Sequence, residues 1–227
     1  MTHKHMKRIS APKSWPILRK QRTWITRPKP GRSFDLSIAL VNVLKDILGI
    51  VRNAKEARYI LLHQGVFVNG RRVYDRRKPV GFMDVVSIPI EKKMFRISLS
   101  QRGKLIAVPV TEKEASLRIV SIKNKVRVKD KIQIACFDGT NVLVDKNMYA
   151  LGDGLVLDQT NSIQKHLPLQ VGASIMVISG KQLGRVGMIT TIAENNIYFT
   201  DAENNEHSTT KNTIFVVGEK NPEVTLK

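Results

Sequence analysis

The chain has 227 residues, 42% of them hydrophobic, and 38 lysines and arginines against 19 aspartates and glutamates give a formal net charge of +19. That hydrophobic fraction supports folded cores and excludes wholesale disorder, and no apolar run reaches the roughly 18 to 20 residues of a membrane span. The positive excess favours a polyanionic partner, with nucleic acid preferred over an anionic membrane surface. One cysteine, Cys136, excludes an internal disulfide and a cysteine zinc site, and fits a reducing, cytoplasmic setting.

Residues 1–34 form a basic N-terminal arm that contains ten cations and no acidic residue. Four prolines interrupt any helix, so we expect the arm to be disordered in the free protein and to become ordered on RNA, with a solvated tail as the alternative. Trp15 and Trp24 either stack on bases or pin the arm to the body. The arm residues expected to contact RNA are Lys4, Lys7, Arg8, Lys13, Trp15, Arg19, Lys20 and Arg22.

Residues 35–93 predict a compact α+β domain. Apolar residues at three- and four-residue spacing over 36–48 predict a helix with one buried face, which Gly49 ends. A second helix begins after Asn53, a favourable N-cap, and Glu56 stands three residues later as the partner in a capping box. Two helices followed by strands within this length make a small module with its own core.

The stretch GVFVNGRRV, residues 65–73, predicts a β-hairpin after the second helix. Asn69 and Gly70 fit a type I′ turn, because both central positions of that turn need a positive φ. Gly65 stands where a helix commonly ends in a left-handed residue. We therefore expect Gly65 and Gly70 to be structural turn glycines.

Basic residues gather on two elements of this domain. Three cations of the second helix are three residues apart and so share a face, and the hairpin and the run behind it add more. Two converging basic elements favour RNA or DNA contact over a solvated face. The expected contacts are Arg52, Lys55, Arg58, Asn69, Arg71, Arg72, Arg76, Arg77 and Lys78.

Residues 94–170 predict a central β-rich domain of short strands, with a hairpin turn at Asp138-Gly139. Five cations alternate between positions 123 and 131, and alternation places them on one side of an extended strand. We expect a cationic stripe there, and a solvated sheet face is the alternative.

Residues 171–227 predict a small barrel, because short strands are separated by a glycine-rich loop. Gly180 and Gly184 are expected to be structural turns, and Lys181 and Arg185 to contact RNA. The loop is not a phosphate-binding P-loop, since Gln182 stands where a magnesium-binding Ser or Thr should follow the lysine.

No arrangement of residues indicates catalysis, a cofactor or a metal ion. Of the five histidines only His3 and His5 are neighbours, and no cysteine or carboxylate accompanies them. Paired carboxylates and a Cys-His set are also missing. We therefore expect a binding protein, not an enzyme, with no small-molecule substrate.

Two stretches resemble known RNA-binding motifs. NAKEARYILLHQGVFVNGRRV is similar to the αL motif of small-subunit ribosomal proteins, and VISGKQLGRVGMI is similar to the KOW motif, a small SH3-like barrel. The arm HMKRISAPKSWPILRKQRTWITRPKPG resembles the N-terminus of the archaeal-type e-type S4 family of small ribosomal subunit proteins. The order of arm, αL motif, β domain and KOW barrel matches that family along nearly the whole chain.

This resemblance implies a multi-domain α+β protein that binds and scaffolds small-subunit rRNA, next to neighbouring small-subunit proteins and away from membranes. Gln182 stands where KOW loops commonly carry a second cation, which bears on how strongly the barrel contacts RNA. The alternatives are a free RNA-binding regulator or accessory factor, such as an elongation-type KOW factor or RNA chaperone, and an RNA-modifying enzyme. An acid-free arm disfavours the regulator, and the remaining residues offer no catalytic domain of adequate size.

Overall fold

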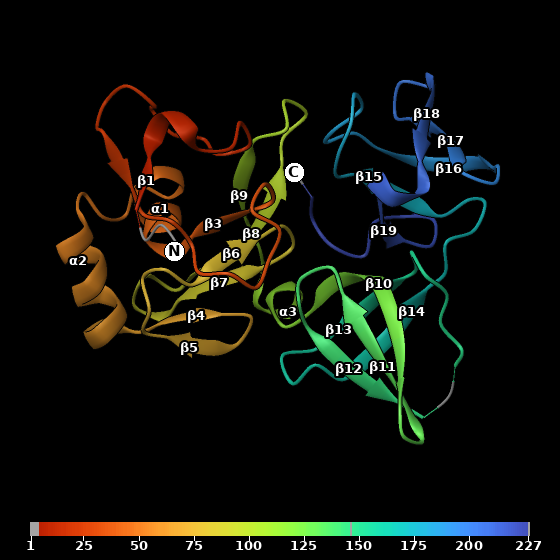
Figure 1. Cartoon of the computed structure of the whole chain (residues 1–227), viewed down its shortest axis with the longest axis horizontal. Coiled ribbons are helices and arrows are strands. Elements are labelled where there is room, and N and C mark those ends of the chain that lie inside the picture. Colours follow the sequence, from red (N-terminus) through yellow and green to blue (C-terminus); the bar gives the residue numbers. More distant parts are fainter. Residues whose placement is uncertain (1–4, 146, 227) are drawn as a thin grey trace. The chain divides into compact units, whose positions relative to one another are not determined.

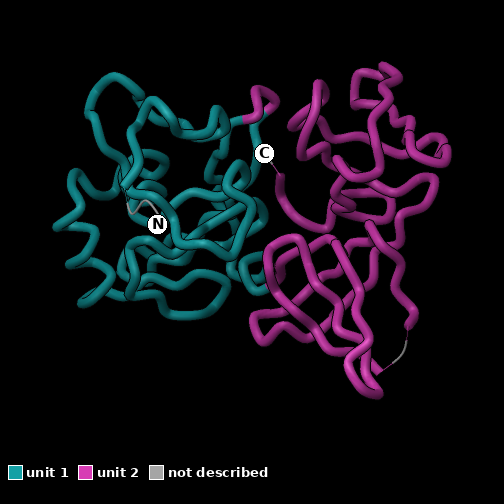
Figure 2. Tube along the Cα trace, in the orientation of Figure 1, with its two compact units in different colours: residues 1–100, 104–116, 227 teal, residues 101–103, 117–226 magenta. Residues whose placement is uncertain are grey.

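A computed structural model describes residues 5–145 and 147–226. The chain divides into two compact units (Figure 2). Unit 1 comprises residues 1–100, 104–116 and 227, and unit 2 comprises residues 101–103 and 117–226. No helix in the described part of the chain is both long and apolar enough to cross a membrane.

Unit 1 is built on a five-stranded antiparallel sheet in the order β5-β4-β7-β8-β9 (Figure 1). Its strands are β4 (Val66–Val68), β5 (Arg71–Val73), β7 (Val85–Ile88), β8 (Lys93–Leu99) and β9 (Leu105–Pro109). The expected domain boundary after residue 93 is therefore wrong. It falls at the start of β8, which pairs with β7 over residues 93–96. Unit 1 runs on through α3 (Glu112–Ala115).

The first expected helix begins later than its apolar pattern indicated. Residues 37–39 form β3 (Ser37–Ala39), which pairs with β6 (Pro79–Gly81). The helix then runs through α1 (Leu40–Asn42) and the π-helical turn η2 (Val43–Ile47). All three residues of β3 are buried, so pairing with a distant strand outweighs the helical periodicity at this end. Gly49 follows the helix with φ +67°.

The second helix confirms its predicted start. It comprises α2 (Ala54–Tyr59) and the π-helical turn η3 (Ile60–Gln64). Asn53 Oδ1 accepts from the backbone N–H groups of Lys55 and Glu56 at 2.9 and 3.0 Å. The Glu56 carboxylate accepts from the Arg52 N–H at 2.7 Å, so its backbone donor lies one residue earlier than in a standard capping box. Gly65 follows the helix with φ +78°.

The arm contains three short elements, β1 (Met6–Lys7), η1 (Arg8–Ser10) and β2 (Trp24–Ile25), and β1 pairs with β2. Trp15 is 1% exposed, and its indole N–H donates to the carbonyl of Ser37 at 2.9 Å. The expectation of a disordered arm does not describe this structure, because the Trp15 side chain is part of the unit 1 core. Of the two uses considered for the tryptophans, Trp15 pins the arm to the body.

Unit 2 contains a five-stranded antiparallel sheet in the order β12-β11-β10-β13-β14. Its strands are β10 (Arg118–Val128), β11 (Lys131–Cys136), β12 (Asn141–Val144), β13 (Gly154–Leu157) and β14 (Ile163–Leu167). Buried Val120, Ile134 and Leu155 belong to its core. The hairpin turn at Asp138-Gly139 is confirmed, since β11 and β12 pair across it and Gly139 has φ +83°.

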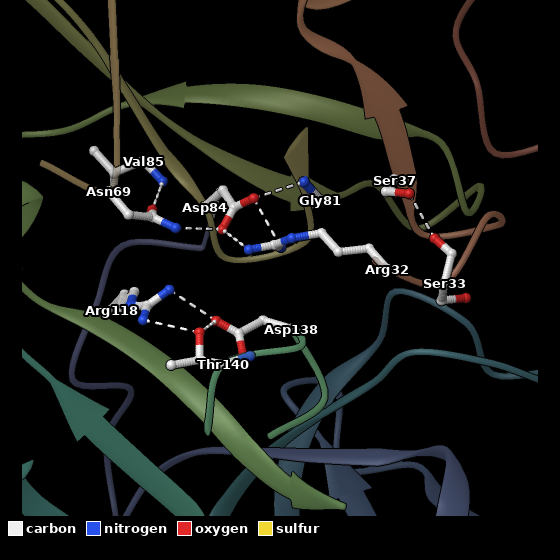
Figure 3. Close-up of polar contacts among 10 residues, drawn as sticks. All are labelled: Arg32, Ser33, Ser37, Asn69, Gly81, Asp84, Val85, Arg118, Asp138 and Thr140. Carbon is white, nitrogen blue, oxygen red and sulfur yellow. Dashed lines mark hydrogen bonds and ion pairs between the residues drawn. The ribbon is translucent and has the colours of Figure 1, made fainter. Parts of the chain in front are cut away.

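The proposed stripe of alternating cations in β10 is interrupted at two places. The pairing register shifts between Ile122 and Asn124, and Lys129 turns the chain with φ +54°. Strict alternation therefore does not extend from 123 to 131, so the five cations do not lie along one unbroken strand face. At the start of β10, Arg118 is buried and donates to Asp138 at 2.7 Å and to Thr140 at 3.1 Å (Figure 3).

The last sheet has the order β18-β17-β16-β15-β19. Its strands are β15 (Ser174–Val177), β16 (Val186–Ile192), β17 (Asn196–Asp201), β18 (Glu206–Thr210) and β19 (Ile214–Gly218). Two further 3-10 turns are η4 (Pro89–Glu91) in unit 1 and η5 (Lys211–Thr213) in unit 2. Gly180 and Gly184 lie between β15 and β16 with φ +92° and +79°, which L-residues rarely adopt. The Gly184 N–H donates to the Val177 carbonyl at 2.8 Å and closes the loop.

Candidate nucleic-acid interface

A buried carboxylate fixes the turn of the β4–β5 hairpin. Asp84 is 1% exposed, and its Oδ1 accepts from Asn69 Nδ2 at 2.7 Å and from Arg32 Nη2 at 2.8 Å (Figure 3). Its Oδ2 accepts from the Gly81 N–H at 2.8 Å and lies 2.7 Å from Arg32 Nη1. Four donors satisfy the two oxygens, and the guanidinium binds them in a bidentate manner. Asp84 thus joins the end of the arm to the hairpin.

The hairpin turn itself has the predicted geometry. Asn69 and Gly70 have φ +52° and +75°, both positive as a type I′ turn requires. Asn69 Oδ1 accepts from the Val85 N–H at 2.9 Å, while its amide nitrogen donates to Asp84. These bonds give the Asn69 side chain a structural role, and its expected contact with RNA stays a prediction. The side chain is held on both sides by protein and positions the turn.

The two arginines behind the turn differ in what holds them. Both are exposed. Arg72 Nη2 donates to the carbonyl of Leu62 at 3.2 Å, and its guanidinium carbon lies 5.0 Å from the centre of the Tyr74 ring. Arg72 is thus fixed against the end of the second helix, whereas Arg71 extends from the edge strand β5.

The remaining cations of this module lie on the second helix and after the hairpin. They are exposed: Arg52, Lys55, Arg58, Arg76 and Lys78. Like charges this near one another repel, so their exposure contributes nothing to stability and suits an anionic partner.

Arg77 is half-buried and ties the basic run to the arm. Its Nε donates to the Arg27 carbonyl at 3.1 Å. Its backbone N–H donates to Asp75 at 2.8 Å, and Asp75 also pairs with Lys29 Nζ at 2.5 Å. Burial acts to raise the pKa of Asp75, but the bonds from Lys29 and Arg77 outweigh it and the pKa is lowered. The Arg77 guanidinium therefore already makes one hydrogen bond within the protein.

Two arm residues expected to contact RNA are turned inward instead. Arg8 is 3% exposed, and its Nη2 lies 3.1 Å from Asp46 Oδ1. Trp15 is buried with its indole bonded to Ser37. In this arrangement neither side chain can reach an RNA strand outside the protein. The expected RNA contacts of Arg8 and Trp15 are therefore corrected.

Arg19 also serves the arm internally. Its guanidinium donates to the carbonyls of Ile9, Ala11 and Pro12 at 3.2, 2.6 and 2.7 Å, which holds the loop together. Lys4 lies outside the described residues. Of the arm cations expected to contact RNA, Lys7, Lys13, Lys20 and Arg22 are exposed.

In unit 2, the two cations expected to contact RNA, Lys181 and Arg185, differ in their accessibility. Lys181 is exposed in the β15–β16 loop. Arg185 Nη1 pairs with Asp201 Oδ2 at 3.1 Å and lies 2.8 Å from His207 Nε2. Arg185 is thus engaged with its own sheet, and Lys181 is the more accessible cation.

Sequence reasoning missed three important side chains of unit 1. Asp84 follows Met83, whose positive φ of +66° marks a tight turn that no local pattern announces. Tyr59 and Tyr74 are both exposed, although aromatic side chains usually bury most of their surface. Attention to aromatic residues between the cations would have found the two tyrosines. Asp84 gave no comparable signal.

Within residues 5–145 and 147–226, no group of three or more His, Cys, Asp or Glu side chains is placed to hold a metal ion. One His–carboxylate pair lies in unit 2, where His166 Nε2 is 2.7 Å from Asp153 Oδ2. The Asp153 carboxylate also accepts from the N–H groups of Ala150 and Leu169, so it orders a turn.

Known proteins match both ends and the middle of the chain. The family model "Ribosomal family S4e" matches residues 91–162, and the model "RS4NT (NUC023) domain" matches residues 2–31. The small ribosomal subunit protein eS4 of Methanosphaera stadtmanae is 35% identical over 233 residues, 99% of this chain and 96% of that one. Its counterpart in Methanospirillum hungatei is 42% identical over 190 residues, 82% of this chain and 78% of that one.

A solved structure is also similar. The crystal structure of the 30S ribosomal protein S4e from Thermoplasma acidophilum superposes with a TM-score of 0.69 at 26% identity, and the match covers 81% of this chain and 96% of that one. Fold, exposed cations and relatives together define a ribosomal protein class. The chain belongs to the S4e, or eS4, family of small ribosomal subunit proteins.

Proposed function

We propose that the protein is a structural constituent of the small ribosomal subunit that binds and scaffolds small-subunit rRNA. The observation that carries this is the set of exposed cations on unit 1, which surrounds a hairpin fixed by a buried ion pair. Relatives named small ribosomal subunit protein eS4 support the assignment. The protein acts without catalysis or cofactor, beside neighbouring small-subunit proteins, on the ribosome in the cytoplasm.

The module from α2 to β5 acts as an αL-type RNA-binding element. The capped helix, the glycine behind it and the Asn69-Gly70 turn present cations from two elements in fixed positions. We assign residues 1–34 to the arm, 35–116 to this domain, 117–170 to the central β domain and 171–227 to a KOW-type SH3-like barrel. The boundary is placed after residue 116 and not after residue 93, because β8 pairs with β7.

Phosphate contacts carry this binding, because lysine and arginine side chains release counterions from the RNA backbone wherever they pair with it. Such contacts position a protein without reading sequence. Arg8 and Trp15 are left out because protein atoms hold their side chains. The proposed contacts are Lys7, Lys13, Lys20, Arg22, Arg52, Lys55, Arg58, Arg71, Arg76, Lys78 and Lys181.

Sedimentation tests the proposal. A cell lysate is separated on a sucrose gradient at high magnesium, and the native protein is detected by an antibody. A ribosomal constituent sediments with the small subunit and stays there after a moderate-salt wash. Protein that remains at the top of the gradient would instead support a free RNA-binding regulator.

A further inference from the structure

We propose that the end of the second helix and the β5 edge form a stacking site for unpaired RNA bases. The site consists of two side-chain pairs, the rings of Tyr59 and His63 and the Arg72 guanidinium with the Tyr74 ring, on either side of Leu62. This inference rests on the proposed rRNA binding and deepens it, since it names single-stranded nucleotides as the ligand of this part of the surface.

The first pair lies along the outer face of the helix. Tyr59 is 59% exposed, and its ring centre lies 4.5 Å from that of His63 with the planes 34° apart. Lys55 stands one turn earlier, so a cation precedes the two rings on the same face. A tyrosine with most of its surface in water contributes little to a core, and its π-face remains available to a ligand.

The second pair is held more firmly. The Arg72 guanidinium lies 5.0 Å from the ring centre of Tyr74, which is 58% exposed. Its Nη2 also bonds to the Leu62 carbonyl, so the planar group is fixed on two sides. A Cβ built at Gly65 would lie 3.6 Å from Arg72 Nε, so the arginine passes close over this glycine. A guanidinium fixed in this way is preorganised to stack against a base and is less able to turn toward a phosphate.

Leu62 connects the pairs into one surface. Its carbonyl binds Arg72, its side chain is 44% exposed, and it precedes His63 directly in the helix. Exposed cations adjoin this surface at Arg58, one turn before Leu62, and at Arg71 on β5.

Alternating rings and cations match one ligand chemistry. Phosphate contact alone needs no aromatic side chain, whereas bases released from a helix stack on aromatic rings and on guanidinium planes. Bases within a duplex are already stacked on each other and cannot take these positions. The adjoining cations would hold the phosphates between the stacked bases, which favours RNA over an apolar protein partner.

The test compares full-length variants by fluorescence anisotropy on two probes, a labelled single-stranded RNA and a duplex RNA of equal length. The Tyr59→Leu, Tyr74→Leu variant removes both tyrosine rings and no charge. The Tyr59→Phe, Tyr74→Phe variant keeps the rings. Tyr198→Leu, at a tyrosine exposed on β17, is the matched control. Circular dichroism verifies that each variant is folded.

We expect the double leucine variant to bind the single strand at least about tenfold more weakly, since loss of one stacked base alone costs about that much. Duplex affinity stays within about twofold and the salt dependence is unchanged, because no cation is lost. The phenylalanine variant, which also serves if the leucine variant does not fold, retains single-strand binding.

Other results would distinguish failure of the stacking site from failure of the proposed rRNA binding. Unchanged single-strand binding by the leucine variant, or an equal loss on both probes, overturns the stacking site and leaves rRNA binding intact. Unchanged single-strand binding would indicate that the exposed tyrosines contact a neighbouring protein and not RNA. If the parent protein binds neither RNA, the proposed function itself fails.

Discussion

Asp84 accepts a 2.7 Å hydrogen bond from the side-chain amide of Asn69, and the same carboxylate forms a bidentate ion pair with Arg32. In a chain with a formal charge of +19, a buried acid is thus used to position a basic hairpin. The end of the arm and the tip of the hairpin share one anchor, so the placement of Arg71 depends on residues far away in sequence.

Removing this charge should destabilise unit 1. Asp84→Asn removes the charge that binds the mostly buried Arg32 guanidinium, and breaking one side of a buried pair costs about 3 kcal/mol. Urea unfolding monitored by circular dichroism measures the loss. Asp130→Asn, at an exposed turn, is the control and should change stability by less than about 0.5 kcal/mol. Equal stability of the two variants would contradict an anchoring role for Asp84.

The two tryptophans should report opposite environments in the free protein. Trp15 is buried and hydrogen-bonded, whereas Trp24 is exposed. In the Trp24→Phe variant the remaining indole should emit at short wavelength and resist acrylamide quenching. In the Trp15→Phe variant the remaining indole should be quenched readily. Strong quenching of both, together with unprotected amides around Trp15 in hydrogen exchange, would show that the arm is not docked without RNA.

Gly184 should be intolerant of a side chain. Its φ of +79° suits glycine, and a β-branched residue there is strained, so Gly184→Val should lower stability by roughly 1 to 3 kcal/mol. Met188→Val, at an exposed position of β16, is the control. Thermal unfolding compares the two variants with the parent. A melting curve for Gly184→Val that matches the parent would remove the argument for a required left-handed residue.

Cys136 should make stability depend on alkaline pH. Burial, with a smaller contribution from Asp138, raises the pKa of the thiol from 9.0 to about 12, although Arg118 opposes the shift. Between these values the unfolded chain releases the proton and the folded chain keeps it, so the free energy of unfolding falls as pH rises. The parent should therefore lose more stability from about pH 8 to about pH 10 than Cys136→Ala. Identical losses would mean that the thiol is not protected in the folded state.

Local signals in the sequence predicted local structure well. The Asn53 cap, the helix end at Gly65 and the turn at Asn69-Gly70 each depend on neighbouring residues alone, and each is confirmed. Such features need only the φ preferences and side-chain donors of a few adjacent residues.

Features that depend on distant partners were missed. The strand at Ser37–Ala39 forms because Pro79–Gly81 lies beside it, and helical periodicity carries no information about that partner. Burial of Arg8 and Trp15 likewise depends on Asp46 and on the Ser37 carbonyl. In a segment so rich in cations, composition alone could not separate inward from outward side chains. The candidate interface was therefore predicted by region, but only partly by residue.

Salt dependence of RNA binding tests the central claim most directly. Binding of a labelled small-subunit rRNA fragment is followed across a salt series for the triple variant Arg58→Ala, Arg71→Ala, Arg76→Ala. Three lost phosphate contacts should flatten the slope of log affinity against log salt by about 2. The control triple Lys104→Ala, Lys113→Ala, Lys220→Ala removes equal charge at exposed positions outside the proposed contacts and should leave the slope nearly unchanged. Equal slopes for the two triple variants would contradict an RNA interface on the helix and hairpin of unit 1.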